Sequence, residues 1–308
     1  MRYGVCVVLG MLSFAGPAGA QDMSQHWARC LNEQEAFTAD QSIEGCTAVI
    51  QAARGVPAKL AIAFNSRGNS HAAKDQPDRA IEDYDQAIRL NPNYAAPHHN
   101  RGGVYLDRAQ YDRAIQDFDQ AIRLNPNDVL SLVYRGLAWH RKGQYDRAIQ
   151  DYDQAIGLDP SALVFSIRGT SYSAKGQYDR AIQDFDQALR LKPNEAVLLS
   201  DRCYAKASAG ALAAALADCN EALRRMPGHA DLLDSRGFTY LKMRQLPQAL
   251  ADYDAALKVD PGQATALFGR GVVRRQMGDV SGGDADIAAA IAIDASVAGR
   301  LARRGVVP

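Results

Sequence analysis

The sequence of 308 residues predicts an all-α solenoid, a stack of helical hairpins in which each hairpin completes the core of its neighbour. The first observation is an arginine-glycine pair that recurs at a step of 34 residues, slipping once to 33. The second is an amphipathic helical pattern in each repeat that stops at a proline. A period of this size is typical of proteins that bind partners along an extended surface. The pairs are Arg67-Gly68, Arg101-Gly102, Arg135-Gly136, Arg168-Gly169, Arg236-Gly237, Arg270-Gly271 and Arg304-Gly305, and Arg202-Cys203 fills the one gap.

The repeat is clearest in residues 95–128. Its second half has apolar residues at helical spacing with Asp, Gln and Arg between them, and it stops at Asn125-Pro126 because proline lacks an amide proton. Its first half contains Gly102, which costs roughly 1 kcal/mol in mid-helix relative to alanine. The return of this glycine in successive repeats therefore predicts a close approach between helices. The apolar positions of the second half are Ala114, Ile115, Phe118, Ala121, Ile122 and Leu124.

These positions resemble the signature of the tetratricopeptide repeat (TPR) family over about residues 60–296. The resemblance implies an α-solenoid, a right-handed superhelix of antiparallel helix pairs whose first helices line a concave groove for peptides or partner proteins. The matching residues are Gly102, Tyr105, Ala114, Phe118, Ala121 and Pro126, then Gly136, Trp139, Ala148, Tyr152, Ala155 and Pro160, then Gly169, Tyr172, Ala181, Phe185, Ala188 and Pro193.

The predicted order along the chain is a signal peptide, a diverged first hairpin, seven repeats and a C-terminal cap. Residues 1–20 have a short positive start, an apolar run too short to span a bilayer and the small-residue cleavage site Ala18-Gly19-Ala20. An uncleaved membrane anchor is the alternative. The hairpin is expected at 23–56, the repeats at 61–94, 95–128, 129–161, 162–195, 196–229, 230–263 and 264–296, and the capping helix and tail at 297–308.

The capping helix is expected to pack Leu301 inward and to give the solenoid a polar end. Its arginines leave a second interpretation open, a basic docking site for an acidic partner.

Four cysteines remain after removal of the signal peptide, and they form two pairs with the same separation of sixteen residues. Cys203 replaces the repeat glycine and Cys219 the aromatic residue that follows it. Cys30 and Cys46 share this register, which selects the disulfides Cys30–Cys46 and Cys203–Cys219 from three connectivities. Free thiols in the core are the alternative. A disulfide framework would support export to the periplasm or secretion.

An aspartate stands sixteen residues after each repeat arginine that precedes glycine or Cys203, except for Arg304. The regularity predicts a ladder of ion pairs between first and second helices, either within a repeat or with the adjacent one. An arginine stripe for anionic ligands is the alternative. The pairs are Arg67 with Asp83, Arg101 with Asp117, Arg135 with Asp151, Arg168 with Asp184, Arg202 with Asp218, Arg236 with Asp252 and Arg270 with Asp286.

The family resemblance also implies which residues line the groove. Asparagines there would bind the backbone of an extended peptide, whereas the alternative is that they only hydrate the helix surface. Leu130 and Tyr134 stand where the chaperone-tail carboxylate clamp of the family has basic residues, so capture of a C-terminal carboxylate is not expected. The groove candidates are Asn65, Asn69, His99, Asn100, Leu137, Tyr204 and Phe238, in a wider lining that includes Ser200, Asp234, Phe268 and Val272.

Composition argues against several function classes. The 35 basic and 35 acidic residues balance, so the sequence has no basic footprint for nucleic acid. It has neither a phosphate-binding glycine loop nor histidines at metal-ligand spacing. We therefore expect no cofactor, no metal, no catalytic residue and no membrane insertion once the signal is removed.

The expected function is an exported, non-enzymatic adaptor for a protein or peptide partner, in the assembly or turnover of cell-envelope complexes. A self-assembling homo-oligomer and an accessory subunit of a glycan-modifying enzyme are the alternatives.

Overall fold

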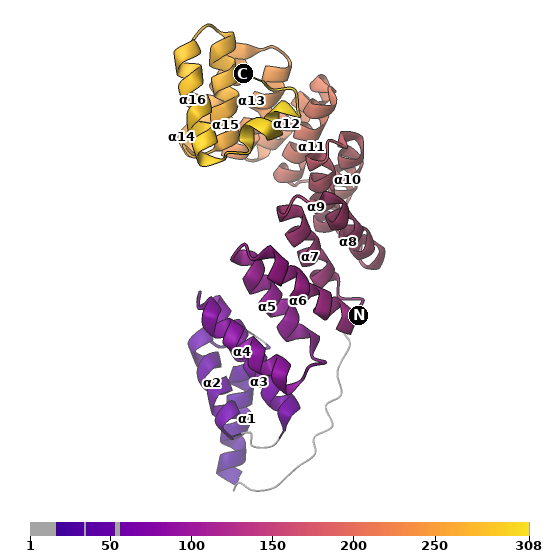
Figure 1. Ribbon diagram of the computed structural model, residues 1–308, viewed down its shortest axis with the longest axis vertical. Helices are drawn as coiled ribbons and strands as arrows, with labels where there is room; N and C mark the ends of the chain where they lie inside the picture. Colours follow the sequence, from indigo (N-terminus) through magenta and orange to yellow (C-terminus); the bar gives the residue numbers. More distant parts are fainter. Residues whose placement is uncertain (1–16, 34, 53–55, 308) are drawn as a thin grey trace. The chain divides into compact units, whose positions relative to one another are not determined.

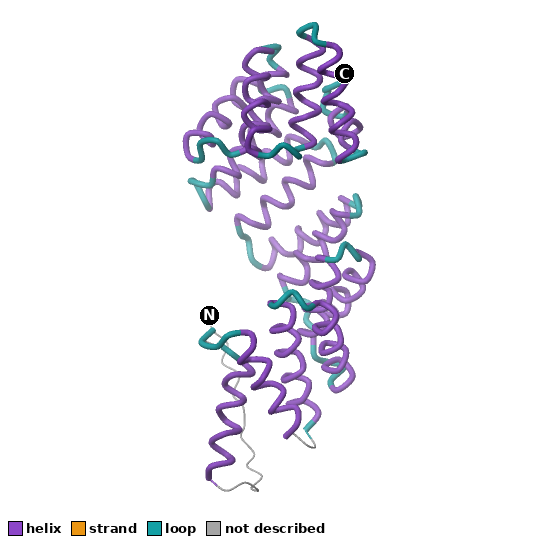
Figure 2. Tube along the Cα trace, turned by 90° about the vertical axis from the view of Figure 1, so that its left-hand side faces the viewer, coloured by secondary structure: helices purple, strands orange, loops and turns teal. Residues whose placement is uncertain are grey.

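The computed structural model describes residues 17–33, 35–52 and 56–307. These residues form helices joined by short turns and include no strand (Figures 1 and 2). Most of the expected signal peptide, residues 1–16, lies outside the described residues, and Pro17 to Ala20 open the first helix. None of the described helices is both long and apolar enough to cross a bilayer. The all-α class expected from the sequence is therefore confirmed.

The helices alternate as first and second members of antiparallel pairs. The bounds are α1 Pro17–Leu31, α2 Ala39–Ala52, α3 Pro57–Ala73, α4 Pro77–Leu90, α5 Ala95–Asp107, α6 Tyr111–Leu124, α7 Val129–Arg141, α8 Tyr145–Leu158, α9 Ala162–Ala174, α10 Tyr178–Leu191, α11 Ala196–Ala209, α12 Leu212–Arg225, α13 Ala230–Lys242, α14 Leu246–Val259, α15 Ala264–Gln276, α16 Val280–Ile293 and α17 Val297–Ala302. The second helix packs on the first in the pairs α1–α2, α3–α4, α5–α6, α9–α10, α11–α12, α13–α14 and α15–α16. Most second helices also pack on the first helix of the next pair.

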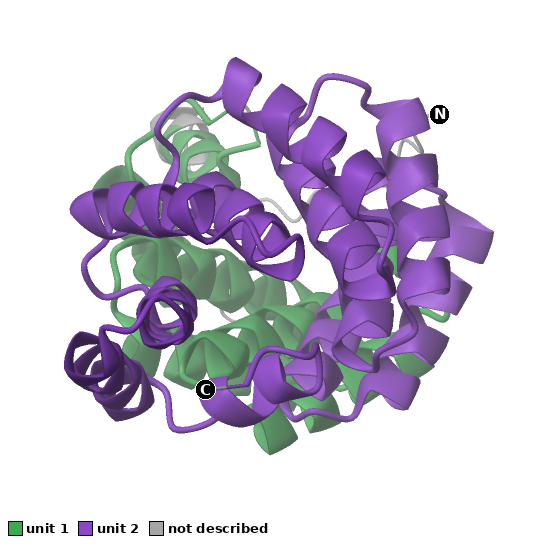
Figure 3. Ribbon diagram, turned by 90° about the horizontal axis from the view of Figure 1, so that it is seen from above, with its two compact units in different colours: residues 1–131 green, residues 132–308 purple. Residues whose placement is uncertain are grey.

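The chain divides into two compact units, residues 1–131 and 132–308, and the division falls within α7 (Figure 3). Unit 1 contains the helices from α1 to α6, and unit 2 contains those from α8 to α17. Each unit is described by itself below.

The repeat glycine brings the two helices of a pair together. A Cβ on Gly102 would lie 2.9 Å from Cε1 of Phe118, and one on Gly136 would lie 2.5 Å from Cε1 of Tyr152. Any side chain at these positions would therefore displace a buried ring. This contact is the packing reason for glycine in mid-helix that the sequence predicts.

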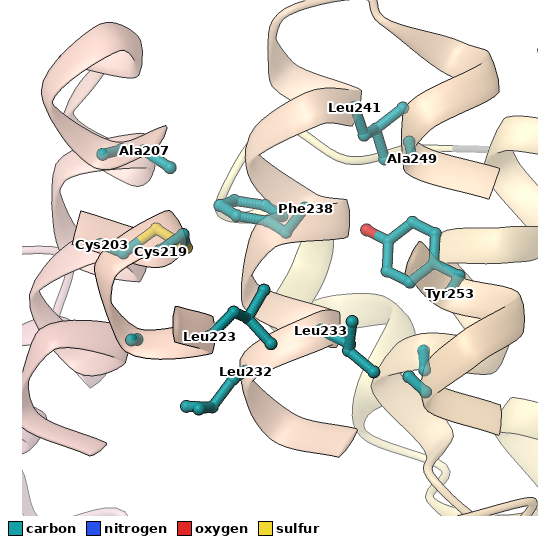
Figure 4. Close-up of a cluster of buried hydrophobic side chains, with 14 of the residues drawn as sticks. Cys203, Ala207, Cys219, Leu223, Leu232, Leu233, Phe238, Leu241, Ala249 and Tyr253 are labelled. Carbon is teal, nitrogen blue, oxygen red and sulfur yellow. A yellow bond between two sulfur atoms is a disulfide. The ribbon is translucent and has the colours of Figure 1, made fainter. Parts of the chain in front are cut away.

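Two disulfides occupy the position of the glycine–aromatic contact in two of the hairpins. The structure joins Cys30 to Cys46 in the first hairpin and Cys203 to Cys219 in the fifth repeat, as the register predicts. The four cysteines are buried at 0–2% exposure. Figure 4 shows Phe238 between the Cys203–Cys219 disulfide and Tyr253 in the core of unit 2.

The ladder of ion pairs is present in all seven repeats. In each repeat the arginine Nε and Nη2 atoms donate to the two oxygens of the expected aspartate, at 2.5–3.0 Å. The aspartates are 4–7% exposed, so these are buried bidentate pairs rather than surface ones. Burial alone would raise the pKa of Asp117, but hydrogen bonds from Arg101 and His98 outweigh it and lower the pKa.

The same arginines also reach the preceding repeat. Arg202 Nη1 donates to Asp186 at 2.7 Å, Arg270 Nη1 donates to Asp254 at 3.0 Å, and Arg101 pairs with Asp85. Each of these arginines therefore ties its own repeat to its neighbour, which fixes the register between repeats.

The C-terminal cap expected at 297–308 consists of the short helix α17 and a tail that also packs on the core. Val297 and Leu301 of α17 are 0% and 4% exposed, and Val306 beyond the helix is 3% exposed. All three belong to the apolar core of unit 2. Residues 297–307, which we call the C-terminal segment, are therefore an integral part of unit 2.

Candidate functional site

Three of the groove candidates form one hydrogen-bonded cluster in unit 1, which we call the amide surface: Asn65, Asn69 and Asn100. Asn65 and Asn69 lie one turn apart on α3, and Asn100 faces them from α5. The Asn100 side-chain NH2 donates to the carbonyl oxygens of Asn65 and Asn69, both at 2.9 Å. Two consecutive first helices thus present their amides together.

The core of the repeat holds this cluster in place. The hydroxyl of Tyr84, the buried ring that packs on Gly68, donates to Asn69 Oδ1 at 2.9 Å. Burial, and then the charge of Asp83, raise the pKa of Tyr84, so the hydroxyl remains a donor at all physiological pH values. Asn69 Oδ1 therefore accepts two hydrogen bonds, from Tyr84 and from Asn100.

This pattern leaves one amide donor and one amide acceptor available at the surface. No group among the described residues bonds to the NH2 of Asn69, which is exposed, or to the side-chain carbonyl oxygen of Asn100, which is half-buried. A peptide backbone offers the complementary pair, one carbonyl acceptor and one amide donor. The amide surface can therefore bind main chain without reading side chains.

His99 lies beside Asn100 but turns to a different network. The Ser131 hydroxyl donates to Asp128 at 2.5 Å, so the His99 Nδ1–H donates to the Ser131 hydroxyl at 2.8 Å. Burial lowers the pKa of His99, and the nearby Asp128 only partly offsets this. His99 is therefore a neutral, positioned side chain at neutral pH rather than a charge.

The candidates in unit 2 are not together at an open surface. Phe238 is 3% exposed and stacks on Tyr204, with ring centroids 4.6 Å apart. Leu137 is half-buried on α7. In the wider lining, Ser200, Phe268 and Val272 are buried as well, at 4%, 1% and 1% exposure. The residues implied for this part of the groove thus lie mostly in the core.

The C-terminal segment contacts the aromatic residues of this region. The Arg304 guanidinium lies 4.7 Å from the centroid of the Tyr204 ring and donates to its hydroxyl. Lys242 Nζ of α13 donates to the Arg304 carbonyl oxygen at 3.0 Å. The sequence gives no signal for this contact, because the two residues are 100 positions apart.

Two carboxyl groups with raised pKa values lie on the first helices of the same region. Burial, and then the charge of Asp231, raise the pKa of Asp201 to about 6. Burial also raises the pKa of Asp234 to about 7, against a hydrogen bond of 2.9 Å donated by Thr265 and the positive charge of Arg304. Both groups therefore titrate near neutral pH.

No cluster of three or more His, Cys, Asp and Glu side chains suited to a metal ion occurs in the residues that the structure describes.

Comparison with known families agrees with this geometry. Models of the tetratricopeptide repeat match residues 61–94, 99–162, 162–195 and 236–298, more than half of the chain together. The chain belongs to the tetratricopeptide repeat family. No curated protein matches its sequence.

Solved tetratricopeptide repeat structures share the fold with this chain. One from Parabacteroides merdae is 17% identical, with a TM-score of 0.62, and the match covers 88% of this chain and 99% of that one. The C-terminal part of a repeat protein from Cytophaga hutchinsonii is 20% identical, with a TM-score of 0.60 and coverages of 80% and 98%. PilF of Pseudomonas aeruginosa is 15% identical, with a TM-score of 0.57 and coverages of 68% and 96%. At these identities the likeness concerns the fold alone.

Proposed function

We propose that this protein is an exported, non-enzymatic adaptor that binds an extended segment of a partner protein at the amide surface of unit 1. The observation that carries the proposal is the pair formed by the Asn69 NH2 donor and the Asn100 carbonyl acceptor, held in place by Tyr84 and Asn65. Such a pair binds backbone of any sequence, which suits an adaptor that holds unfolded or unassembled chains.

Export to the periplasm, or secretion, is supported by two features. Residues 1–20 resemble a signal peptide, and both disulfides need an oxidising compartment to persist. We expect the protein from a periplasmic extract to begin at Gln21 on N-terminal sequencing. Recovery of a chain that begins at Met1 would contradict the export proposal.

The test of the binding proposal uses a photoreactive side chain at Gly103, one turn after Asn100. A Cβ at Gly103 meets no atom within 4 Å, so the substitution leaves the packing intact. Gly157 in unit 2 is the matched control, since it is also helical and equally open. We expect crosslinks to a partner from Gly103 and far fewer from Gly157.

The double variant Asn69→Ala, Asn100→Ala completes this test. Each lost hydrogen bond should weaken binding by roughly three- to tenfold, so crosslinking from Gly103 should fall sharply. Equal crosslinking with and without the two asparagines would contradict the proposed site. Growth of the purified protein into large assemblies in light scattering, without a partner, would instead favour the self-assembling alternative.

A further inference from the structure

A pocket of unit 2 lies between the C-terminal segment, the first residue of α8 and the turn from α9 to α10. Its volume is about 250 Å³. The C-terminal segment supplies one wall with its arginines, and α8, α9 and α10 supply the other. The lining residues are Tyr145, Ser173, Ala174, Lys175, Gly176, Tyr178, Arg300, Arg303 and Arg304.

The lining of this pocket is strongly basic. It carries four cationic side chains and three hydroxyl groups, and no carboxylate lines it. Two of the cations have carboxylate partners outside the lining: Lys175 pairs with Asp146, and Arg300 pairs with Asp294. The other two cations, Arg303 and Arg304, form no salt bridge with any of the described residues.

Arg304 is in register with the repeat arginines, since it stands 34 positions after Arg270 and also precedes a glycine. Its seven predecessors each donate two hydrogen bonds to a buried aspartate. Arg304 instead lies on the Tyr204 ring and donates to a neutral hydroxyl. Arg304 thus contacts an aromatic ring and a hydroxyl where its predecessors form buried ion pairs.

We infer that this pocket, which we call the tail pocket, is an anion site that accepts a carboxylate side chain from an acidic peptide. The fork of an arginine matches a carboxylate geometrically, and the Tyr145 and Tyr178 hydroxyls can donate to the same oxygens. The volume admits one side chain rather than a large ligand. The inference rests on the proposed adaptor function and adds that the segment reaching unit 2 is acidic.

The test compares two fluorescent peptides of equal length, one of glutamate and one of glutamine, in anisotropy titrations with the full-length mature protein. We expect the glutamate peptide to bind more tightly and its affinity to fall as salt is raised. Arg303→Gln should weaken it at least fivefold, since a charge-assisted hydrogen bond is lost. The Arg303 side chain is exposed and forms no hydrogen bond or salt bridge with the described residues, so this variant should unfold at the wild-type temperature.

Arg190→Gln is the matched control, because it removes an exposed positive charge of the same unit that does not line the pocket. Equal weakening by Arg190→Gln and Arg303→Gln would overturn the site, as would equal affinity for the two peptides. Binding of inorganic phosphate, measured directly by calorimetry, without binding of the glutamate peptide would overturn the peptide assignment. Equal, tight binding of both peptides would leave the backbone-binding proposal standing while this inference fails.

Discussion

The two units are built from the same repeat, yet they treat the surface of their first helices differently. Unit 1 leaves the amides of Asn69 and Asn100 available, whereas unit 2 buries Phe238 and sets Arg304 of its own C-terminal segment against Tyr204. The shared second helices and ion pairs hold both units in the same fold. The difference therefore shows that two features determine which surface can bind a partner: the first-helix side chains, and the segments of the same chain that pack on them.

The largest expected effect concerns what the units share. Asp117→Ala in unit 1 and Asp252→Ala in unit 2 each leave a repeat arginine without its buried partner, so each should cost about 3–5 kcal/mol. Urea unfolding followed by circular dichroism measures both. The more exposed pairs of Glu221 with Arg224 and Arg225 are the control, and Glu221→Ala should change little. Costs below about 1 kcal/mol for both aspartates would contradict a buried ladder.

The next effect concerns the disulfide of unit 2. Removal of the Cys203–Cys219 bond as Cys203→Ala, Cys219→Ala should cost about 3 kcal/mol by loop entropy. The variant Cys203→Gly, Cys219→Tyr should recover part of this loss, because it restores the glycine–aromatic contact seen in the other repeats. Thermal unfolding is measured with and without reductant for the wild type and both variants. Reduction of the Cys203–Cys219 bond should lower the unfolding temperature of the wild type only, because neither variant contains this bond. A restored variant no more stable than the alanine pair would show that bond and contact are not equivalent.

The C-terminal segment packs on the core of unit 2, so a substitution in it should affect unit 2 and leave unit 1 unchanged. Leu301→Ala should cost about 2–3 kcal/mol, because it empties a buried site in the core of unit 2. Hydrogen exchange should then rise in α11, α13 and α15 but stay unchanged in the helices of unit 1. Faster exchange in α3 and α5 would contradict the assignment of the segment to unit 2 alone.

The raised pKa of Asp234 predicts a pH dependence for unit 2. The native state binds the proton of this group more tightly than the unfolded chain, so its stabilising contribution is complete at about pH 4 and is lost as pH rises through about 7. Asp234→Asn should remove this loss, on the order of 1–2 kcal/mol for a partly exposed group. Burial lowers the pKa of His140 of α7 as it lowers that of His99, so these histidines contribute with the opposite sign. Unfolding of wild type and variant is compared at each pH, which cancels their contribution. Parallel pH profiles would contradict the shift.

The smallest effect tests a turn that both units use. Asp75, Ala109 and Arg244 have left-handed backbone, with φ of 55°, 56° and 61°, at the turn position where Gly143, Gly176, Gly210 and Gly278 stand in other repeats. Arg244→Gly should therefore stabilise the protein by about 0.5–1 kcal/mol. Gly278→Ala is the reciprocal control and should destabilise it, as measured by the urea midpoint.

Periodic features of this fold could be predicted from sequence because each occurs many times. Arg101 and Asp117 are sixteen positions apart in the same way as six other pairs, and the cysteines share that spacing. The second carboxylate that Arg101 binds, Asp85, also stands sixteen positions away, on the N-terminal side. The spacing alone does not show that this pair joins two repeats, because that depends on how the repeats stack.

Features without a period could not be predicted. The contact of Arg304 with Tyr204 occurs once, and it depends on how the end of the chain packs on unit 2. Phe238 was expected in the groove because family resemblance places its helix position there. It lies in the core because Tyr204 and the disulfide surround it. The position of a residue in the repeat determines which way its side chain points. The residues packed around it determine whether that side chain is exposed to solvent.

The most direct test compares the available first-helix surface of unit 1 with the covered one of unit 2. A photoreactive side chain is placed at the equivalent repeat positions Gly103 and Tyr204, one at a time, in cells that export the protein. We predict that the side chain at Gly103 captures a partner chain, and that the one at Tyr204 crosslinks within the molecule to the peptide containing Arg304. Capture of a partner from Tyr204, with no internal crosslink to the C-terminal segment, would contradict the account.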